Sequence, residues 1–238
     1  MGRTRKGLSA AGRPGGGSLR DADIVAAGLT LLDEVGWSQF TMRALADRVN
    51  AFPNSIYWHV GGRDRVVALV VERALGEIVV PSPPADDDWR PWLAAVAREY
   101  RRVLHAHPNV APIVTGQVLV SPPSLTLVEA ILAVLRRAGF DGPRLTLAYN
   151  TFVGSVVGWV SVELAVPPPG PVDWQTEFES AIRGIDATAH PTIAEHRDQL
   201  ADTAFALRWH GGQDRPLDAS FEAALAVWLD GLAVARAK

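Results

Sequence analysis

Apolar residues near the N-terminus recur every three or four positions, which is the spacing of one face of an α-helix. The first helix is predicted to begin at Ser18, a residue type that caps helix N-termini. It is predicted to end at Gly36, because glycine adopts the left-handed conformation of a helix stop at little cost. The inward face of this helix is predicted to contain Ile24, Ala27, Gly28, Leu31, Leu32 and Val35.

Two shorter helices follow at close intervals. Thr41 is a capping residue for a second helix. The inward residues of that helix are predicted to be Met42, Leu45, Ala46 and Val49. Asn50 stands where the chain must turn sharply, and asparagine tolerates the positive φ of such a turn. A third helix is predicted over Pro53–Val60, because proline suits the first helical position and two glycines follow the last.

The helical spacing continues to the end of the chain. A segment rich in proline and aspartate at 81–88 interrupts it, and a run of prolines at 167–171 interrupts it again. Further helices are predicted over residues 63–79, 89–106, 109–118, 124–138, 144–166, 174–186, 191–207 and 218–237. No strand pattern is found, so we expect an all-α chain with a basic arm over 1–18, a three-helix head within 19–80 and a larger helical body over 81–238.

Composition narrows the class of protein. An apolar share of 48% in 238 residues is typical of a globular chain. The absence of cysteine excludes disulfide scaffolds, thiolate zinc sites and cysteine nucleophiles. Residues 1–18 lack the apolar stretch of a secretory signal. These features together fit a cytoplasmic protein.

One segment, 145–162, is uncharged and long enough to cross a bilayer. Polar side chains within it argue against a membrane span, and Glu163 follows it directly. The polar residues are Thr146, Asn150, Thr151, Ser155 and Ser161. We favour the alternative, in which this segment is a helix of the body that is buried on all of its sides, and we expect no membrane partner.

The formal charge of −3 conceals an asymmetry along the chain. Residues 1–75 carry ten basic and seven acidic side chains, a net charge of +3, whereas the remaining residues carry thirteen and nineteen, a net charge of −6. No acidic residue precedes Asp21. A basic head on an acidic body is typical of a protein that binds a polyanion.

Three short helices with a tight turn between the second and third describe a helix-turn-helix unit, whose third helix enters the major groove of DNA. The outward positions of that helix are Asn54, Ser55, Tyr57, Trp58 and His59. Short polar side chains near its start suit base edges, whereas tyrosine and histidine can donate to phosphates. Arg43 and Arg63 add positive charge on either side.

The segments TMRALADRV at 41–49, IYWHV at 56–60 and RD at 63–64 resemble the head of the tetracycline repressor (TetR) family. The body is similar to the ligand-binding part of that family in the order of its helices and in its final helix. The resemblance implies an all-helical homodimer that represses transcription. Its two heads would bind a palindromic operator in double-stranded DNA, and a small-molecule inducer in the body would release it.

The resemblance also implies individual roles in the head. Three residues would begin the supporting helix near the DNA backbone: Thr41, Met42 and Arg43. Three would face bases: Pro53, Asn54 and Ser55. Three would contact phosphates or the wall of the groove: Tyr57, Trp58 and His59. Arg63 would add a further backbone contact.

Two positions depart from the family pattern. Asn50 stands where relatives usually have glycine, and Phe52 stands where a small polar cap is common. Loss of such a cap costs about 1 kcal/mol in typical helices. We expect Phe52 to pack inward, the alternative being contact with a thymine methyl group. Trp58 fits the core of the head as well as it fits a DNA contact.

The body offers aromatic walls with few polar groups, as small-molecule pockets do. The predicted ligand-binding residues are Trp92, Tyr100, His105, Gln117, Tyr149, Phe152 and Trp159. Gly154 and Gly158 lie one turn apart, a spacing that lets another helix approach closely. Since the resemblance places subunit contacts on the long helix and the last helix, we expect the dimer seam at 144–166 and 218–237.

Motifs of common enzymes are not found. Gly154 and Ser155 do not form a Gly-x-Ser-x-Gly elbow, and no His-Glu-x-x-His sequence is present. His105 and His107 diverge on a helix, which disfavours a shared metal. We therefore expect no catalytic residue, metal or cofactor. The alternatives to a ligand-released repressor are an activator or constitutive repressor with the same head, and a helical enzyme or membrane-associated carrier.

Overall fold

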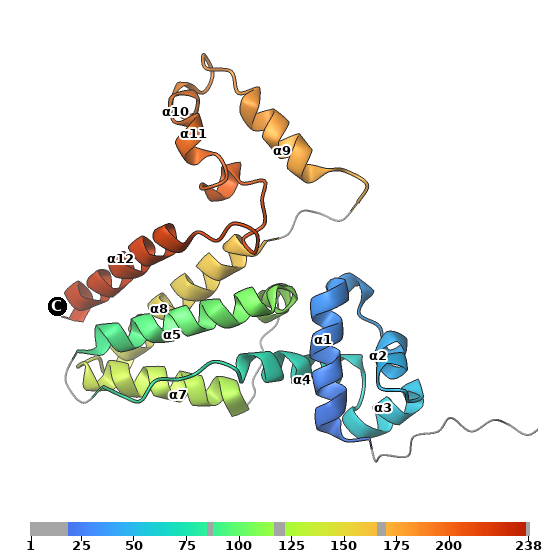
Figure 1. Cartoon of the computed structure of the whole chain (residues 1–238). Coiled ribbons are helices and arrows are strands. Elements are labelled where there is room, and N and C mark those ends of the chain that lie inside the picture. Colours follow the sequence, from blue (N-terminus) through green and yellow to red (C-terminus); the bar gives the residue numbers. More distant parts are fainter. Residues whose placement is uncertain (1–18, 85–87, 117–121, 166–169, 237–238) are drawn as a thin grey trace, which may run out of the picture.

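The computed structural model describes residues 19–84, 88–116, 122–165 and 170–236, and these contain helices and no strand (Figure 1). The N-terminal helices are α1 (Asp21–Gln39), α2 (Met42–Arg48), α3 (Pro53–Val60) and α4 (Arg63–Leu75). The body contains α5 (Trp89–Ala106), η1 (Pro108–Val110), α6 (Ala111–Gly116), α7 (Pro122–Arg137), α8 (Gly142–Glu163), α9 (Trp174–Arg183), α10 (Pro191–Glu195), α11 (Arg197–Leu200), η2 (Phe205–Leu207) and α12 (Asp218–Arg236). The predicted all-α fold is confirmed. The arm predicted over 1–18, with its Ser18 cap, lies outside the described residues.

The predicted caps and turns shape α1, α2 and α3, which form the head. The Thr41 Oγ1 accepts a hydrogen bond from the Ala44 N–H (3.1 Å) at the start of α2. Asn50 has a φ of 50°, in the left-handed region predicted for the turn before α3. Gly36, with a φ of 70°, interrupts the helical backbone of α1, although a further turn continues to Gln39. These local signals set the directions in which the three helices leave their turns.

α4 lies against α1 and runs from the head to the body (Figure 1). A Cβ atom at Gly28 would lie 2.8 Å from the Val70 Cγ2, so glycine permits the close approach of these two helices. The prediction that this helix extends to residue 79 is wrong, because it ends at Leu75. The Val79 N–H instead donates to the Glu99 carboxylate on α5 (3.2 Å), which holds the chain after α4 in a non-helical course.

The single helix predicted over 191–207 is also wrong. This segment forms the short α10, α11 and η2, which are separated by turns. Asp202 has a φ of 60°, and its N–H donates to the Leu207 carbonyl (3.1 Å) rather than to a carbonyl one helical turn earlier. A left-handed residue in the middle of the segment breaks a continuous helix.

α5 is the central helix of the body and contacts α7, α8 and α12. Its inward face carries the residues predicted for it: Trp92, Val96, Tyr100 and Val103. Figure 1 shows α12 and α8 side by side, with α9, α10 and α11 at their outer end. The amphipathic pattern of α5 therefore places it between the other long helices of the body.

The expectation that the long apolar helix is buried on all sides is wrong for the single chain. α8 buries one face that includes Phe152, Val156 and Val160. Its opposite face is uncharged and largely exposed, and we call it the α8 stripe: Leu147, Thr151, Gly154, Gly158 and Val162. Among the described residues, α8 is the one helix that is long and apolar enough to cross a membrane by length and composition. An apolar stripe of this length requires a cover.

A buried carboxylate joins three helices at the end of α8. Glu163 is 1% exposed and accepts two hydrogen bonds from Arg101 of α5 (2.8 and 2.7 Å) and one from the Leu217 N–H, next to α12 (2.7 Å). Burial alone would raise the Glu163 pKa, but these bonds and the nearby His105 ring lower the pKa to about 2. The charged carboxylate therefore fixes the ends of α8 and α12 to α5.

Candidate DNA-binding face and ligand cavity

α3 presents a polar and aromatic face to the outside of the head. It is anchored by Ile56 and Val60, whose side chains are buried. Tyr57 is 48% exposed and Trp58 is 89% exposed, and both point away from that core. Asn54 and His59 are also exposed, whereas Pro53 and Ser55 are half-buried. Most of the predicted DNA-binding residues of α3 are thus accessible to a groove.

Three expectations about the head need correction. Met42 is 8% exposed in the core of the head, which confirms its predicted inward position, so its side chain is not available for the DNA contact that the resemblance implied. Phe52 was expected to pack inward, but it is 69% exposed immediately before α3. The core position considered for Trp58 is wrong, because Ile56 and Val60 already fill that side of α3. Because side chains hold fixed positions around a helix, the rotation of α3 about its axis determines which of its residues face outward as a group.

Basic side chains lie on either side of α3. Arg43 is exposed near the start of α2. Arg63 is half-buried, with its guanidinium 4.0 Å from the centre of the Trp37 ring and 3.5 Å from the Phe40 carbonyl oxygen. Packing over an indole restricts the guanidinium and prepares it for contact with an anion.

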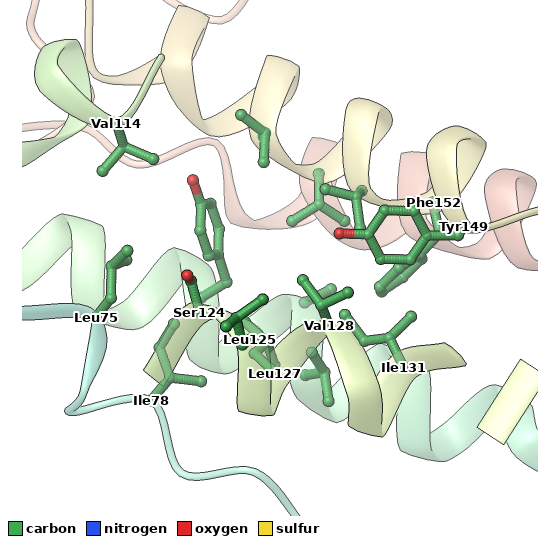
Figure 2. Close-up of a pocket in the computed structure, with 16 residues that line it drawn as sticks. Leu75, Ile78, Val114, Ser124, Leu125, Leu127, Val128, Ile131, Tyr149 and Phe152 are labelled. Atoms are coloured by element: carbon green, nitrogen blue, oxygen red, sulfur yellow. The ribbon is translucent and has the colours of Figure 1, made fainter. Parts of the chain in front are cut away.

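A cavity of about 280 Å³ lies in the body, with walls from α5, α7 and α8. Figure 2 shows Leu125, Val128 and Ile131 of α7 across the cavity from Tyr149 and Phe152 of α8. Leu75, the last residue of α4, also lines the cavity, as does Ile78 just after it. The cavity is therefore in contact with the end of the helix that begins at the head.

The structure brings together only part of the predicted ligand-binding set. Tyr100, Tyr149 and Phe152 line the cavity. Three other residues do not line it: Trp92, His105 and Trp159. The Trp92 indole donates to the Pro81 carbonyl (3.0 Å), His105 lies 3.2 Å from Glu163, and Trp159 packs edge-on against Phe205, Phe221 and Trp228. Gln117 lies outside the described residues.

Sequence reasoning missed the aliphatic wall of the cavity. The residues missed include Leu75, Ile78, Val96, Ile131, Val153 and Val156. Aliphatic residues at helical spacing are the normal content of a helical core, so their pattern does not separate a cavity wall from a filled core. Only the packing of α5, α7 and α8 shows which of them face open space.

A histidine links the head to the body. The His107 Nδ1 lies 2.8 Å from the Asp33 carboxylate of α1, and its Nε2 lies 3.2 Å from the Glu77 carboxylate after α4. A neutral imidazole can donate from one nitrogen only, so contact with two carboxylates favours the doubly protonated ring. Burial alone would lower the His107 pKa, but the hydrogen bonds to both carboxylates raise it. Other charged groups near this cluster are Glu34, Arg73 and Arg102.

His107→Gln is expected to lower the free energy of unfolding at about pH 6 by roughly 1.5–3 kcal/mol, the worth of hydrogen bonds to charged groups. Because the folded-state pKa is raised above 6.5, this stabilisation is complete below that pH and is lost as pH rises through the raised value. Denaturant titrations at about pH 6 and about pH 9 measure the difference. The matched control is His190→Gln, at an exposed histidine. Equal pH dependence in both variants and the parent chain would contradict the prediction.

Comparisons with known proteins agree with this arrangement. The family model described as tetracyclin repressor-like, C-terminal domain, matches residues 80–236. An HTH-type transcriptional regulator of Saccharopolyspora erythraea is 37% identical over 173 residues, which are 73% of this chain and 66% of that protein. The tetracycline repressor protein class A from transposon 1721 of Escherichia coli is 32% identical over 219 residues, which are 92% of each chain.

Solved structures share the fold. The Streptomyces coelicolor TetR family protein ActR, in complex with actinorhodin, superposes with a TM-score of 0.73 at 22% identity, covering 93% of this chain and 100% of that chain. A possible TetR family transcriptional regulator of Streptomyces coelicolor A3(2) superposes with a TM-score of 0.72 at 27% identity, covering 90% of this chain and 98% of that chain. The arrangement of α1 to α12 is therefore that of known regulators.

An exposed recognition helix on a small helical head, joined to a helical body with a cavity, defines a helix-turn-helix transcriptional regulator. The matches over most of the chain also identify its family: the chain belongs to the tetracycline repressor family. Regulators of this family bind operator DNA and small-molecule ligands and form dimers.

Proposed function

We propose that the protein is a homodimeric repressor of the cytoplasm that binds a palindromic operator and leaves it when a small molecule occupies the body cavity. One observation carries this proposal: α4 begins beside the recognition helix α3 and ends at the cavity. Arg63 starts α4 next to the aromatic residues of the head, and Leu75 ends it in the cavity wall. A ligand that displaces Leu75 or Ile78 would therefore tilt α4, and with it the head to which α4 is joined.

The dimer seam is proposed to lie on α8 and α12. The α8 stripe is uncharged, and Leu147 and Val162 on it are 65% and 50% exposed. On α12, Val227 and Val234 are 68% and 61% exposed. Burying such apolar area contributes about 25 cal/mol per Å². A second copy of the chain, related by a twofold axis, would cover these residues with the same surface.

Glycines support the same seam. Beyond the neighbouring residues and backbone of its own helix, a Cβ added at Gly154, Gly158 or Gly231 would meet no atom of the described residues within 4 Å. Packing within one chain therefore gives no reason for small residues at these positions. A helix of a second copy that approaches closely gives such a reason.

The DNA contacts are proposed for the accessible part of the predicted set. Asn54 and Ser55 would face bases, with Pro53 beside them, and the larger side chains of α3 would reach phosphates or the groove wall. The larger side chains are Tyr57, Trp58 and His59. Thr41, Arg43 and Arg63 would contact the backbone, whereas Met42 is excluded by its burial.

The mechanism is proposed as competition between two states of the dimer. Operator binding favours the state whose recognition helices are about 34–36 Å apart, so that both enter the major groove on one face of the duplex. A ligand in the cavity favours another separation of the recognition helices. Binding of the ligand and binding of the operator therefore weaken each other, with a coupling free energy of typically about 1–3 kcal/mol. The contacts of His107 with Asp33 and Glu77 lie on this route between cavity and head.

Selection of bound sequences from random DNA duplexes tests the proposed function. The expected result is a site with twofold symmetry and half-sites about one helical turn apart, bound with a steep dependence on salt. A monomer that binds no duplex even at low salt would overturn the proposal. A reporter gene behind the selected site then separates a repressor from an activator, since both would share the same head.

A further inference from the structure

The cavity of the body lacks charge. None of its lining residues within the described part of the chain is acidic or basic, and most are aliphatic. An ionised ligand group would lose its hydration there without meeting a counter-charge, which is strongly unfavourable. The cavity therefore favours a neutral ligand.

One buried polar group in the cavity has no partner. Tyr100 lines the cavity and is only 8% exposed, and its hydroxyl makes no hydrogen bond with any described residue. A buried hydroxyl without a partner is unfavourable, and an acceptor placed against it removes that penalty. Burial raises the Tyr100 pKa, so the hydroxyl stays protonated and can donate.

The remaining polarity of the cavity is slight. Tyr149 and Ser124 supply the other hydroxyl groups among the described lining residues (Figure 2). A volume of about 280 Å³ lies near the lower end of the roughly 300–1,000 Å³ usual for ligand pockets. A compact ligand with a large apolar surface and few polar atoms matches this lining.

We propose that the effector of this regulator is a neutral, largely apolar molecule with a carbonyl or ether oxygen that accepts a hydrogen bond from the Tyr100 hydroxyl. The inference rests on the proposed function, because it assigns the chemical class of ligand for the same cavity. Carboxylates and amines are not expected to bind there.

Three related probes test the ligand class by calorimetric titration of the full chain. Benzophenone is neutral and has a carbonyl oxygen, diphenylmethane has the same two rings without it, and diphenylacetate adds a negative charge. We expect benzophenone to bind more tightly than diphenylmethane and diphenylacetate to show no binding. Irradiation of bound benzophenone attaches it to nearby C–H groups, so peptide mapping is expected to find it on α5, α7 or α8.

Tyr100→Phe tests the proposed donor. The variant is expected to lower the affinity for benzophenone about threefold to tenfold and to leave that for diphenylmethane unchanged. Its thermal midpoint without ligand is not expected to fall, because the substitution removes a buried hydroxyl that has no partner. Ser180→Ala is the control, because it removes an exposed hydroxyl on α9 outside the cavity, and it is expected to keep the benzophenone affinity within about twofold.

The outcomes separate this inference from the proposed function. Binding of diphenylacetate as tight as that of benzophenone would overturn the neutral class, and an unchanged benzophenone affinity in Tyr100→Phe would overturn the donor. Failure of all three probes would overturn the inference while leaving operator binding, measured on the same sample, to stand. Benzophenone that binds in the cavity without releasing the operator would contradict the release mechanism and leave the ligand class in place.

Discussion

Tyr57→Ala is expected to lower the affinity of the dimer for its operator by about two to four orders of magnitude. The Tyr57 side chain is 48% exposed on α3 and is not needed by the core of the head, which is filled by Ile56 and Val60. A hydrogen bond to a charged group such as a phosphate is worth about 1.5–3 kcal/mol, and a symmetric dimer loses it twice. Gel-shift titration with the selected duplex measures the effect.

The specificity of the change distinguishes the roles of two residues on α3. A phosphate contact carries no sequence information, so Tyr57→Ala should weaken binding to all duplexes alike. Asn54→Ala should instead relax the preference at one base pair in each half-site. Phe178→Ala, at an exposed aromatic residue on α9, is the matched control for loss of an aromatic surface. Unchanged operator affinity in Tyr57→Ala, with the dimer intact, would contradict the DNA-binding face assigned to α3.

Gly154→Glu combined with Gly158→Glu is expected to convert the dimer into monomers. A Cβ at either glycine meets no described atom outside its own helix within 4 Å, and glutamate is a better helix former than glycine, so the single chain should keep its stability. In the dimer the new carboxylates would be buried without partners, which typically costs about 3–5 kcal/mol. The dimer dissociation constant should therefore rise by about two to four orders of magnitude.

Sedimentation equilibrium over a range of protein concentrations measures this shift. Ala133→Glu is the control, because Ala133 is a small, exposed residue on α7, outside the seam proposed on α8 and α12. Operator affinity should fall together with dimerisation, since two heads must bind together. A stable dimer of the double variant would place the seam on another surface.

The head was the most predictable part of the molecule. The Thr41 cap, the left-handed Asn50 and Gly36, and the proline at the start of α3 were all correctly predicted from single residues. Each of these signals acts within a few residues of the chain, so neighbouring sequence is enough to identify it. Phe52 was mispredicted, because its direction depends on how α3 sits against α1 and α2.

The ligand cavity was less predictable. Of the residues predicted to bind a ligand, Tyr100, Tyr149 and Phe152 line one cavity, but Trp92 and Trp159 have partners elsewhere. All five are large aromatic residues on buried helix faces, and the sequence gives them the same pattern. Whether such a residue fills a core or borders a void depends on helices that are far apart along the chain.

Local signals were sufficient for most helices, the Thr41 cap and the recognition motif of this regulator, but not for the end of α4 or the breaks within 191–207. Packing between distant segments settled which other faces are buried: Trp58 lies outside the core of the head, one side of α8 is uncovered, and the Tyr100 hydroxyl lies at a cavity with no partner among the described residues. The physical reason is that burial is a property of surfaces in contact, and the contacts of α8 with α5, α7 and α12 join residues far apart along the chain.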